Sequence, residues 1–448
     1  MKVKEILSNL TLSNCTTDTT FFQAVEEVLD SIIPAIQENS QYEKHNIIQR
    51  LLTPDREIKF KVEWLGDNGS VQVNNGYRIQ FNNVLGPYKG GLRFHPSVNA
   101  GVLKFLAFEQ IFKNALTGLP IGGGKGGSDF DPKNKSDAEI MKFCYAFMTE
   151  LHKYIGPRID VPAGDIGVGA REIGYLFGAY KKMTSRYEGV LTGKPIFFGG
   201  SVGRPEATGY GVVYFARELL EDELKTTLKD KICSVSGSGN VAIYTIEKLQ
   251  ELGAKVITCS DSSGSIYDDR GINLELLKEL KLTKRARLSE YVKTHKEAQY
   301  IPVEEYPEDG HFVWSVKCDM AFPCATQNEL TLKDAKSLIK HNTIAVVEGA
   351  NMPSTKDAMD LFNSNDILFA PAKASNAGGV SVSEFEMSQN SSMTRWGMEK
   401  VDTNLQFVMK EIYRRISTSA KQYDTHLSDG ANIYAFKKVA DAMIAQGV

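Results

Sequence analysis

One stretch of the sequence, residues 231–261, constrains the fold more than any other. It reads KICSVSGSGNVAIYTIEKLQELGAKVITCSD, with an apolar run at 232–236, a glycine turn, a helical pattern ending at Gly253 and a second apolar run at 255–259. A strand, a helix and a parallel strand in this order form the repeating unit of a doubly wound α/β sheet. The sequence therefore predicts a Rossmann-type sheet. Three later apolar runs supply its further strands: residues 320–322, 344–347 and 367–369.

The glycine turn between the first strand and the helix fits the dinucleotide-binding pattern G-x-G-x-x-G/A. An acidic residue, Asp261, follows the turn by 19 positions. The first glycine permits the tight turn, the second lets a pyrophosphate approach the backbone, and the phosphates face the N-terminus of the helix. The pattern predicts a dinucleotide site, the alternative being a glycine turn that binds nothing. The residues of the turn are Gly237, Ser238, Gly239, Asn240, Val241 and Ala242.

The residues after the second strand bear on which nicotinamide cofactor binds. Asp261 would ordinarily accept a hydrogen bond from a ribose 2′-hydroxyl and repel a 2′-phosphate. However, Ser262 and Ser263 can donate to a phosphate, and a basic cluster follows about one helix later. We predict NADP, with NAD as the alternative, although the cluster by itself is also compatible with a solvated helix face. The cluster consists of Lys281, Lys284, Arg285 and Arg287.

The first half of the chain mixes helices and strands. The character changes near residue 200, where glycine, serine and proline precede a helix that starts near Ala207. We therefore expect two domains, residues 1–200 and 201–424, with a C-terminal helix at about 425–448 that packs back on the first. Within the first domain, helical patterns cover residues 21–36, 98–117 (with Ser97 as N-cap) and 141–154, and alternating patterns at 58–64 and 76–82 predict strands.

Residues 120–131, PIGGGKGGSDFD, surround Lys125 with five glycines. A phosphate-binding P-loop needs Ser or Thr directly after its lysine and a strand before it, whereas here Gly126 follows the lysine and a helical pattern precedes the segment. A solvated linker would not carry Ile121 and Phe130. We predict a buried loop whose glycines let substrate and backbone close around Lys125.

Three lysines within 37 residues lie beside glycine or in an apolar frame: Lys89, Lys113 and Lys125. Gln110 precedes Lys113 by three positions and shares its helix face. Converging ammonium groups suit a substrate with two carboxylates, and they depress one another's pKa so that one can act as a base. The alternative is that each lysine extends its charge to solvent. Asp165, in the turn sequence DVPAGDIG, is the matching carboxylate, unless that turn is only structural.

Composition excludes several other classes of protein. A net charge of −3 without a block of Lys or Arg gives no electrostatic footprint for nucleic acid. The six cysteines form no C-x-x-C pair and the seven histidines are scattered, so neither a metal site nor a disulfide framework is expected. No apolar run approaches the roughly 18 residues of a membrane helix, and the N-terminus lacks the apolar core of a signal peptide. We expect a cytoplasmic enzyme.

Eight motifs spread over nearly the whole chain carry a resemblance to a known family. They read GPYKGGLRFHPSVN, FEQIFKNALTGLPIGGGKGGSDFDP, DVPAGDIGVGAREI, RPEATGYG, SGSGNVA, PCATQNEL, EGANMP and ASNAGGV. Together they resemble glutamate dehydrogenase of the small hexameric type. The resemblance implies an N-terminal α/β domain for substrate binding and oligomerisation, a Rossmann-type domain and a cleft between them. It also implies a homohexamer that interconverts L-glutamate with 2-oxoglutarate and ammonia, passing hydride to or from NADP.

The resemblance also implies roles for individual residues. Lys125 would activate the water that attacks the imine, and Asp165 would carry protons to and from the nitrogen. The residues implied to bind substrate are Lys89 and Ser383 for the side-chain carboxylate, and Gln110, Lys113 and Gly91 for the α-carboxylate. The residues implied to line the cofactor side are Arg204, Thr208, Asn240, Asn351 and Asn376.

Details of the motifs bear on the alternatives within this family. Ser238 and the pair Asp261–Ser262 resemble the NADP-using members, since NAD-using relatives tend to have a bulky residue at 238 and glycine at 261. Glu384 departs from the glycine usual after the substrate-binding serine and adds a negative charge there. The alternatives are the same reaction with NAD or with both cofactors, and a dehydrogenase for leucine, valine or phenylalanine. A nucleotide-binding protein without catalysis would require loss of Lys125 or Asp165, and both are present.

Overall fold

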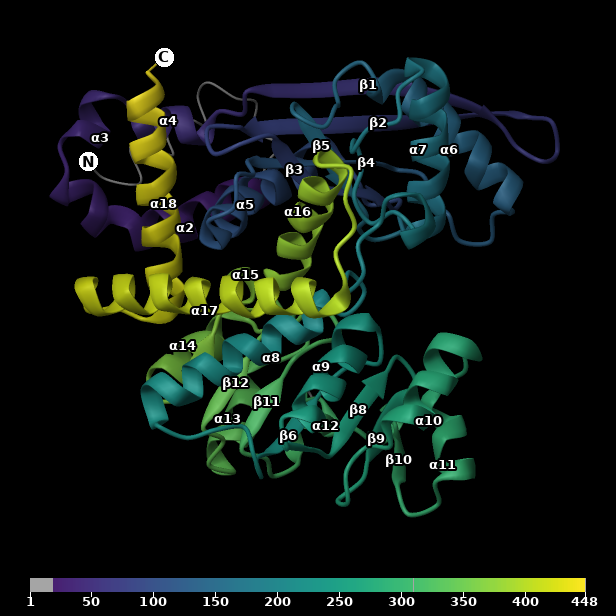
Figure 1. The fold of residues 1–448 in the computed structure, drawn as a ribbon. Coiled ribbons are helices and arrows are strands. Elements are labelled where there is room, and N and C mark those ends of the chain that lie inside the picture. The colour runs from purple at the N-terminus through teal and green to yellow at the C-terminus, as the bar shows by residue number, and fades with distance from the viewer. Residues whose placement is uncertain (1–18, 309, 448) are drawn as a thin grey trace. The chain divides into compact units, whose positions relative to one another are not determined.

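The computed structural model describes residues 19–308 and 310–447, which form two compact units (Figure 1). The first unit takes the described residues up to Val202, together with Val382–Val401 and residues 429–447. The second takes Gly203–Ser381 and Asp402–Ser428. None of the helices in the described residues combines the length and the apolar character needed to cross a membrane.

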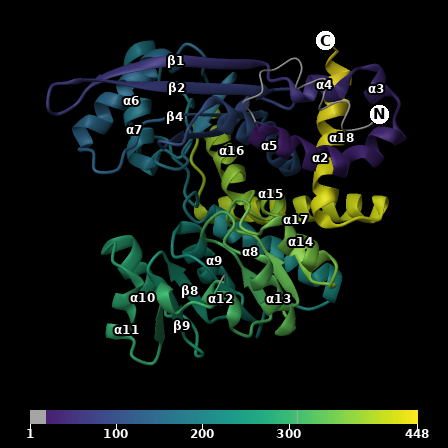
Figure 2. The same cartoon turned by 180° about the vertical axis from the view of Figure 1, so that it is seen from behind.

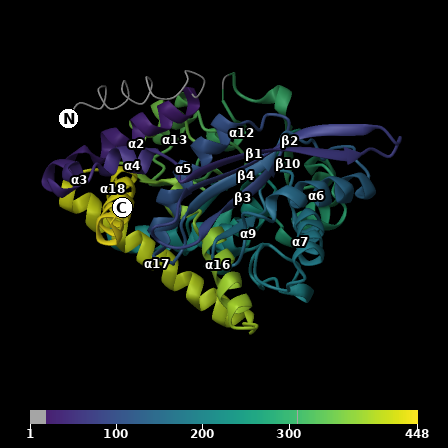
Figure 3. The same ribbon diagram turned by 90° about the horizontal axis from the view of Figure 1, so that it is seen from above.

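The first unit is built on a five-stranded mixed sheet in the order β1-β2-β4-β3-β5. Figure 3 shows β1, β2, β4 and β3 side by side. β1, β2 and β4 are antiparallel neighbours, whereas β3 is parallel to both β4 and β5. The strands are β1 Arg56–Leu65, β2 Val71–Asn82, β3 Tyr88–Phe94, β4 Gly123–Ser128 and β5 Asp160–Ala163. The helices are α2 Thr19–Glu38, α3 Gln41–Lys44, α4 Ile47–Leu52, α5 Ala100–Thr117, α6 Asp137–Leu151, α7 Ala170–Thr184 and, from the later segments, most of α16 Gly378–Ser391 and α18 Leu427–Gln446.

Aromatic side chains fill the core of this unit. On one side of the sheet, Phe143 of α6 stacks on Phe130 at 3.8 Å between ring centroids and meets Phe94 of β3 edge-on. The ring of Phe108 on α5 lies 5.8 Å from the ring of Phe81 on β2, measured between centroids. α18 joins the same unit beside α3 and α4 (Figures 1 and 2), where the Tyr42 hydroxyl donates to Asp441 at 2.8 Å.

Helix α5 begins two residues later than the sequence predicts. The side chain of Asn99 caps it by accepting from the Val102 N–H at 3.0 Å, and Gly118 ends it in the left-handed region at φ 76°. Ser97 is therefore not the N-cap, because its hydroxyl is paired with His95 Nδ1 at 2.8 Å. An N-cap oxygen must reach the second or third N–H of the helix, and Asn99 is the residue placed to do so.

The glycine-rich segment around Lys125 is a strand, so the prediction of a loop is wrong. β4 runs between β2 and β3 and is buried along its whole length. A Cβ on Gly123 would lie 2.5 Å from Ile111 Cγ1 of α5, and one on Gly127, at φ 152°, would lie 2.0 Å from the Arg93 carbonyl oxygen. The glycines therefore let a helix and a neighbouring strand approach the backbone that carries Lys125.

The second unit contains the predicted parallel sheet, in the order β13-β12-β11-β6-β7. The strands are β6 Ile232–Val235, β7 Lys255–Val256, β11 Met320–Phe322, β12 Ala345–Val347 and β13 Leu368–Ala370. All neighbours are parallel, and the direction of winding changes between β6 and β11. Ligands of doubly wound sheets bind beyond the carboxyl ends of the strands at such a point.

Helices cover both faces of this sheet. α12, α13 and α14 bury one face through a cluster that includes Trp314, Leu338 and Phe362, while α8 and α9 lie on the other (Figures 1 and 2). The helices of the unit are α8 Ala207–Leu219, α9 Asn240–Glu251, α10 Leu274–Lys278, α11 Tyr291–Thr294, α12 Phe312–Ser315, α13 Leu332–Lys340, α14 Lys356–Asn363, α15 Ala372–Ser375 and most of α17 Met398–Tyr423.

The predicted second strand at 255–259 does not remain in the parallel sheet. After β7 the chain turns into β8 Thr258–Asp261, which forms a separate antiparallel sheet with β9 Gly264–Tyr267 and β10 Gln299–Pro302. α10 and α11 lie beside this small sheet (Figures 1 and 2). The serine-rich segment after Asp261 is thus the turn of a hairpin, because Asp261 pairs with Gly264.

Candidate functional site

Lys125 and Asp165 meet in the first unit. Lys125 Nζ lies 2.8 Å from Asp165 Oδ2, and the two side chains are only 10% and 16% exposed. A third group, Arg93 on β3, donates from Nε to the same carboxylate oxygen at 3.1 Å. One carboxylate is therefore held between two cations.

The two cations set the charge state of Asp165. Burial raises the pKa of its carboxyl, but the charges of Lys125 and Arg93 outweigh burial and bring the pKa to about 2. Asp165 is therefore ionised at neutral pH and is a proton acceptor in this arrangement.

Backbone geometry explains why Asp165 reaches this position. It follows β5 in a tight turn in which its carbonyl accepts from the Val168 N–H at 2.9 Å. A Cβ on Gly91 would lie 2.8 Å from the Asp165 Cβ, so only glycine lets β3 pass this close to the carboxylate. Gly91, predicted at the substrate site, therefore adjoins the candidate catalytic pair.

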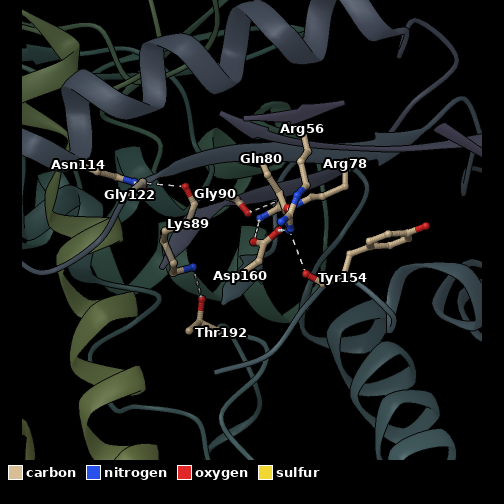
Figure 4. Close-up of polar contacts among 10 residues, drawn as sticks. All are labelled: Arg56, Arg78, Gln80, Lys89, Gly90, Asn114, Gly122, Tyr154, Asp160 and Thr192. Atoms are coloured by element: carbon tan, nitrogen blue, oxygen red, sulfur yellow. Dashed lines mark hydrogen bonds and ion pairs between the residues drawn. The ribbon is translucent and has the colours of Figure 1, made fainter. Parts of the chain in front are cut away.

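Lys89, two residues earlier on β3, is almost fully buried. Its ammonium donates to the Thr192 hydroxyl at 2.8 Å (Figure 4). The carbonyl of the next residue, Gly90, accepts from Arg78 Nη1 at 3.2 Å. Arg78 is itself paired with Asp160, and both side chains are fully buried. The buried Arg78–Asp160 ion pair is thus hydrogen-bonded to the strand segment that carries Lys89.

Gln110 and Lys113 lie on α5, the helix that packs on β4. They are three residues apart and therefore share a face. Gln110 Nε2 donates to Asn114 Oδ1 at 2.7 Å, and Asn114 in turn donates to the carbonyls of Lys89 and Gly122. Gln110 and Lys89, predicted to contact the same substrate, are thus connected through one buried side chain.

Ser383 is buried on α16, three residues before Glu386 and on the same side of the helix. Glu386 forms a buried ion pair with Lys194 at 2.8 Å and accepts from the Gly193 N–H at 2.9 Å. It therefore fixes the segment that follows Thr192. Glu384 accepts from Ser388 Oγ at 2.8 Å, one turn along its own helix.

In the second unit, the glycine turn stands at the carboxyl end of β6. Gly237 lies in the left-handed region at φ 84°, and its N–H donates to Ser260 Oγ at 2.8 Å. Gly239 is the N-cap of α9, and a Cβ built there meets no protein atom within 4 Å. The fold itself therefore does not require glycine at 239, whereas a pyrophosphate at the helix N-terminus does. Ser238, Asn240 and Val241 complete the turn, with Ser238 buried.

Of the residues predicted to select the cofactor, one cluster beside the β8–β9 turn takes in Asp261, Ser262, Ser263, Lys281 and Arg287. Lys284 instead pairs with Glu279 at 2.7 Å. Asp261 Oδ2 lies 3.1 Å from Lys281 Nζ and accepts from the Leu288 N–H at 3.0 Å. Burial raises the pKa of Asp261, but hydrogen bonds from Ser263, Leu288 and Lys281 outweigh it and leave the pKa below its ordinary value. Arg287 Nη1 donates to Ser262 Oγ at 2.6 Å. Lys281 compensates the negative charge of Asp261, and Arg287 and Ser262 lie beside this pair. The arrangement fits a 2′-phosphate.

The remaining predicted cofactor residues lie near the start of α8 and the end of α15. Asn376 Nδ2 donates to Asn351 Oδ1 at 3.0 Å, while Asn376 Oδ1 is buried without a hydrogen-bond partner. A Cβ on Gly379 would lie 2.5 Å from Thr208 Oγ1 and 3.5 Å from Arg204 Nη1, so these two side chains adjoin the same glycine. The unpaired amide oxygen of Asn376 suits an amide donor such as the nicotinamide carboxamide.

Four further residues of the candidate site were not predicted from the sequence: Arg93, Arg78, Gln80 and Thr192. Arg93 stood inside the quoted motif GGLRFHPS, and Arg78 and Gln80 lie two apart on one face of a buried strand, a pattern of polar residues that signals a buried network. Thr192 carries no sequence signal. Among the described residues, no group of three or more His, Cys, Asp or Glu side chains is placed to hold a metal ion.

Comparison with known proteins matches both units to one family. A family model described as "Glutamate/Leucine/Phenylalanine/Valine dehydrogenase" matches residues 199–447, and one described as "Glu/Leu/Phe/Val dehydrogenase, dimerisation domain" matches residues 54–182. The chain is 59% identical to an NADP-specific glutamate dehydrogenase of Helicobacter pylori over 96% of each chain. It is 54% identical to an NAD(P)-specific glutamate dehydrogenase of Xylanibacter ruminicola, again over 96% of each.

A solved structure shares the fold. Plasmodium falciparum glutamate dehydrogenase superposes with a TM-score of 0.95 at 50% identity, covering 99% of this chain and 94% of that one.

Proposed function

The chain belongs to the Glutamate/Leucine/Phenylalanine/Valine dehydrogenase family, and from this premise we propose that it catalyses the reversible oxidative deamination of L-glutamate to 2-oxoglutarate and ammonia with NADP. The observation that carries the proposal is the contact between Lys125 and Asp165, 2.8 Å apart and shielded from solvent. Imine hydrolysis needs an activated water and a proton acceptor next to the reacting carbon, and this pair supplies both kinds of group.

Each residue of the pair has one task in the proposed reaction. Asp165, ionised in the ligand-free protein, accepts a proton from the substrate nitrogen and returns it in the reverse direction. Lys125 hydrogen-bonds the water that attacks the imine carbon. After its own ammonium proton has passed to solvent, the neutral amine takes up the proton that this water loses. NADP, when bound, supplies the nicotinamide that accepts the hydride. Because Lys125 and Arg93 compensate the carboxylate in the ligand-free protein, substrate must draw one of these cations away for Asp165 to become a stronger base.

Charge favours glutamate over an aliphatic amino acid. The buried ammonium of Lys89 attracts a side-chain carboxylate, whereas leucine or valine would place methyl groups against it. We assign Lys89 and Ser383 to the side-chain carboxylate, and Gln110, Lys113 and Gly91 to the α-carboxylate.

NADP is proposed as the cofactor. Gly239, where a Cβ would meet no protein atom, is open to a pyrophosphate. Lys281, by pairing with Asp261, reduces the repulsion between that carboxylate and a 2′-phosphate, and Arg287 with Ser262 offers it donors. The other proposed contacts are Gly237, Ser238, Asn240, Val241, Arg204, Thr208, Asn351 and Asn376.

Domain roles, assembly and location are proposed along with the reaction. We assign substrate binding to residues 1–200, with the segment 382–401 and a C-terminal helix at about 425–448, and dinucleotide binding to the remainder of residues 201–424. The dimerisation model that matches residues 54–182 supports an oligomer, which we propose to be a homohexamer; sedimentation velocity measures its mass. In the part of the chain that the structure describes, five cysteines are free and buried, which fits the reducing cytoplasm; cell fractionation tests this location.

One steady-state assay tests substrate and cofactor together. The purified enzyme is supplied with 2-oxoglutarate and ammonia against NADPH and NADH, and in the other direction with L-glutamate and L-leucine. We expect kcat/KM to be highest with 2-oxoglutarate and NADPH. A higher kcat/KM on leucine than on glutamate contradicts the proposed substrate, and a preference for NADH contradicts the proposed cofactor.

A further inference from the structure

Asn114 is a fully buried amide on α5 that touches three segments of the candidate site. Its Nδ2 donates to the Lys89 carbonyl at 3.2 Å and to the Gly122 carbonyl at 2.5 Å, and its Oδ1 accepts from Gln110 Nε2 at 2.7 Å. Figure 4 shows the Asn114 side chain beside Gly122 and the backbone of Lys89. One amide therefore joins the strand of Lys89, the segment leading to Lys125 and the side chain of Gln110.

The partners of Asn114 fix the direction in which its amide points. Two of them are carbonyl oxygens, which can only accept, so the NH₂ group must face them. The Oδ1 atom must then face Gln110, and Gln110 must present an N–H to it. One N–H of Gln110 is thereby assigned to Asn114, and the second N–H is the one that can reach a carboxylate.

The sheet offers few hydrogen-bond donors to the carbonyls of Lys89 and Gly122. β3 pairs with β4 only from Leu92 and Gly126 onward, so Lys89 has no partner residue on β4, although it pairs with Val161 of β5 on the other side. Gly122 stands immediately before β4 begins, and both residues are buried. A buried carbonyl without a donor is costly, so the side chain of Asn114 takes the place of a ladder hydrogen bond at both points.

We propose that Asn114 is a positioning residue of the glutamate site. It holds the backbone of Lys89 at a set distance from the start of β4, the strand that carries Lys125, and it orients the Gln110 amide so that an N–H faces the α-carboxylate. The inference rests on the proposed function. Asn114 touches neither substrate nor cofactor, and its effect on them passes through Lys89, Gln110 and β4.

The test compares substitutions of Asn114 with a matched asparagine on the same helix. Asn114→Ala removes all three hydrogen bonds, and Asn114→Asp keeps the shape but cannot donate. Asn99→Ala removes the N-cap of α5 and touches no residue of the site. For each folded variant, KM for 2-oxoglutarate, KM for NADPH and the midpoint of thermal unfolding are measured.

We expect both Asn114 variants to raise KM for 2-oxoglutarate by about tenfold or more, the equivalent of a lost or misdirected hydrogen bond. KM for NADPH should stay within about twofold, because no cofactor contact passes through Asn114. Asn99→Ala should lower the unfolding midpoint and leave both KM values unchanged. A folded Asn114→Ala enzyme with KM for 2-oxoglutarate within about twofold of wild type overturns the proposal, as does an equal rise of KM in Asn99→Ala.

Two further variants cover the remaining outcomes. If Ala and Asp at 114 prevent folding, Asn114→Ser keeps one donor, and an unchanged KM for 2-oxoglutarate in that enzyme overturns the proposal. Combining Asn114→Ala with Gln110→Ala should cost less than the product of the single effects, whereas independent effects overturn the assignment of Gln110. A wild-type enzyme inactive on 2-oxoglutarate overturns the proposed function as well, while an active wild type with unaffected Asn114 variants overturns this inference alone.

Discussion

Replacing Arg78 by methionine tests whether the buried ion pair supports the first unit. Arg78 and Asp160 are both fully buried, and Arg78 donates to both oxygens of the carboxylate. With methionine at 78, Asp160 keeps a hydrogen bond from Gln80 Nε2 at 3.0 Å but loses its counter-charge. The Gly90 carbonyl also loses its Arg78 donor.

The expected loss of stability follows from these contacts. Breaking one side of a buried ion pair costs about 3–5 kcal/mol, because it leaves a charge buried without compensation. The orphaned Gly90 carbonyl adds about 1 kcal/mol. At about 2–4 °C per kcal/mol for a unit of this size, the unfolding midpoint should fall by about 8–24 °C.

Calorimetry of three variants tests whether the buried ion pair stabilises the first unit. Arg78→Met combined with Asp160→Leu removes both charges and should recover most of the loss, because the desolvation cost disappears with the pair. Lys61→Met breaks the exposed pair with Glu63 on β1 and should move the midpoint by less than about 2 °C. If Arg78→Met unfolds within about 3 °C of wild type, or if the double variant is no more stable than the single one, the buried pair does not support the unit as argued.

Three further outcomes follow from single residues. Asp165→Asn should lower kcat about 10²–10⁴-fold with little change in KM. The control Asp129→Asn alters a carboxylate that accepts hydrogen bonds from Asn74 and Asn75, and it should keep kcat near normal. Equal kcat values in the two enzymes would remove Asp165 from the mechanism. Gly239→Ala should fold normally but raise KM for NADPH about tenfold. Gly127→Ala should be strongly destabilised, because its Cβ would lie 2.0 Å from the Arg93 carbonyl oxygen. A stable Gly127→Ala enzyme would contradict the packing described for β4. Burial raises the pKa of Glu348 from 4.5 to about 7 against hydrogen bonds from Ser354 and Ala372, so the folded chain binds a proton that the unfolded chain has lost. Its contribution to stability is complete below pH 4.5 and falls as the pH rises towards 7, and thermal unfolding at pH 5, 6 and 7 should show a weaker pH dependence in Glu348→Gln.

The second unit was the easier one to predict, for a physical reason. Parallel strands with helices on both faces are buried on both sides, so β6, β11 and β12 read as short continuous apolar runs. The glycine turn was found from local spacing alone. The separate sheet of β8, β9 and β10 was not predicted, because the sequence around Asp261 carries turn residues without showing which strand the chain returns to.

The first unit shows where local pattern is insufficient. Glycine has low β-propensity, so nothing local indicated that residues 123–128 form a central strand. The strand exists because β2, β3 and α5 pack against a backbone that has almost no side chains. Asn99 rather than Ser97 caps α5 for a similar reason, since neighbouring groups decided which of two suitable side chains was available.

Sequence alone identified the family, and it predicted the dinucleotide turn and the chemistry of Lys125 and Asp165, because these depend on residue type and short spacing. Only the tertiary structure decided what surrounds them. Lys125 stands on β4, Arg93 on β3 and Asp165 after β5, and these strands are adjacent in the sheet in that order. The pKa of Asp165 is about 2 because that order brings two cations to one carboxylate. Strand order and register arise from packing between distant segments, so no local pattern in the chain could reveal that Arg93, as well as Lys125, would hold Asp165.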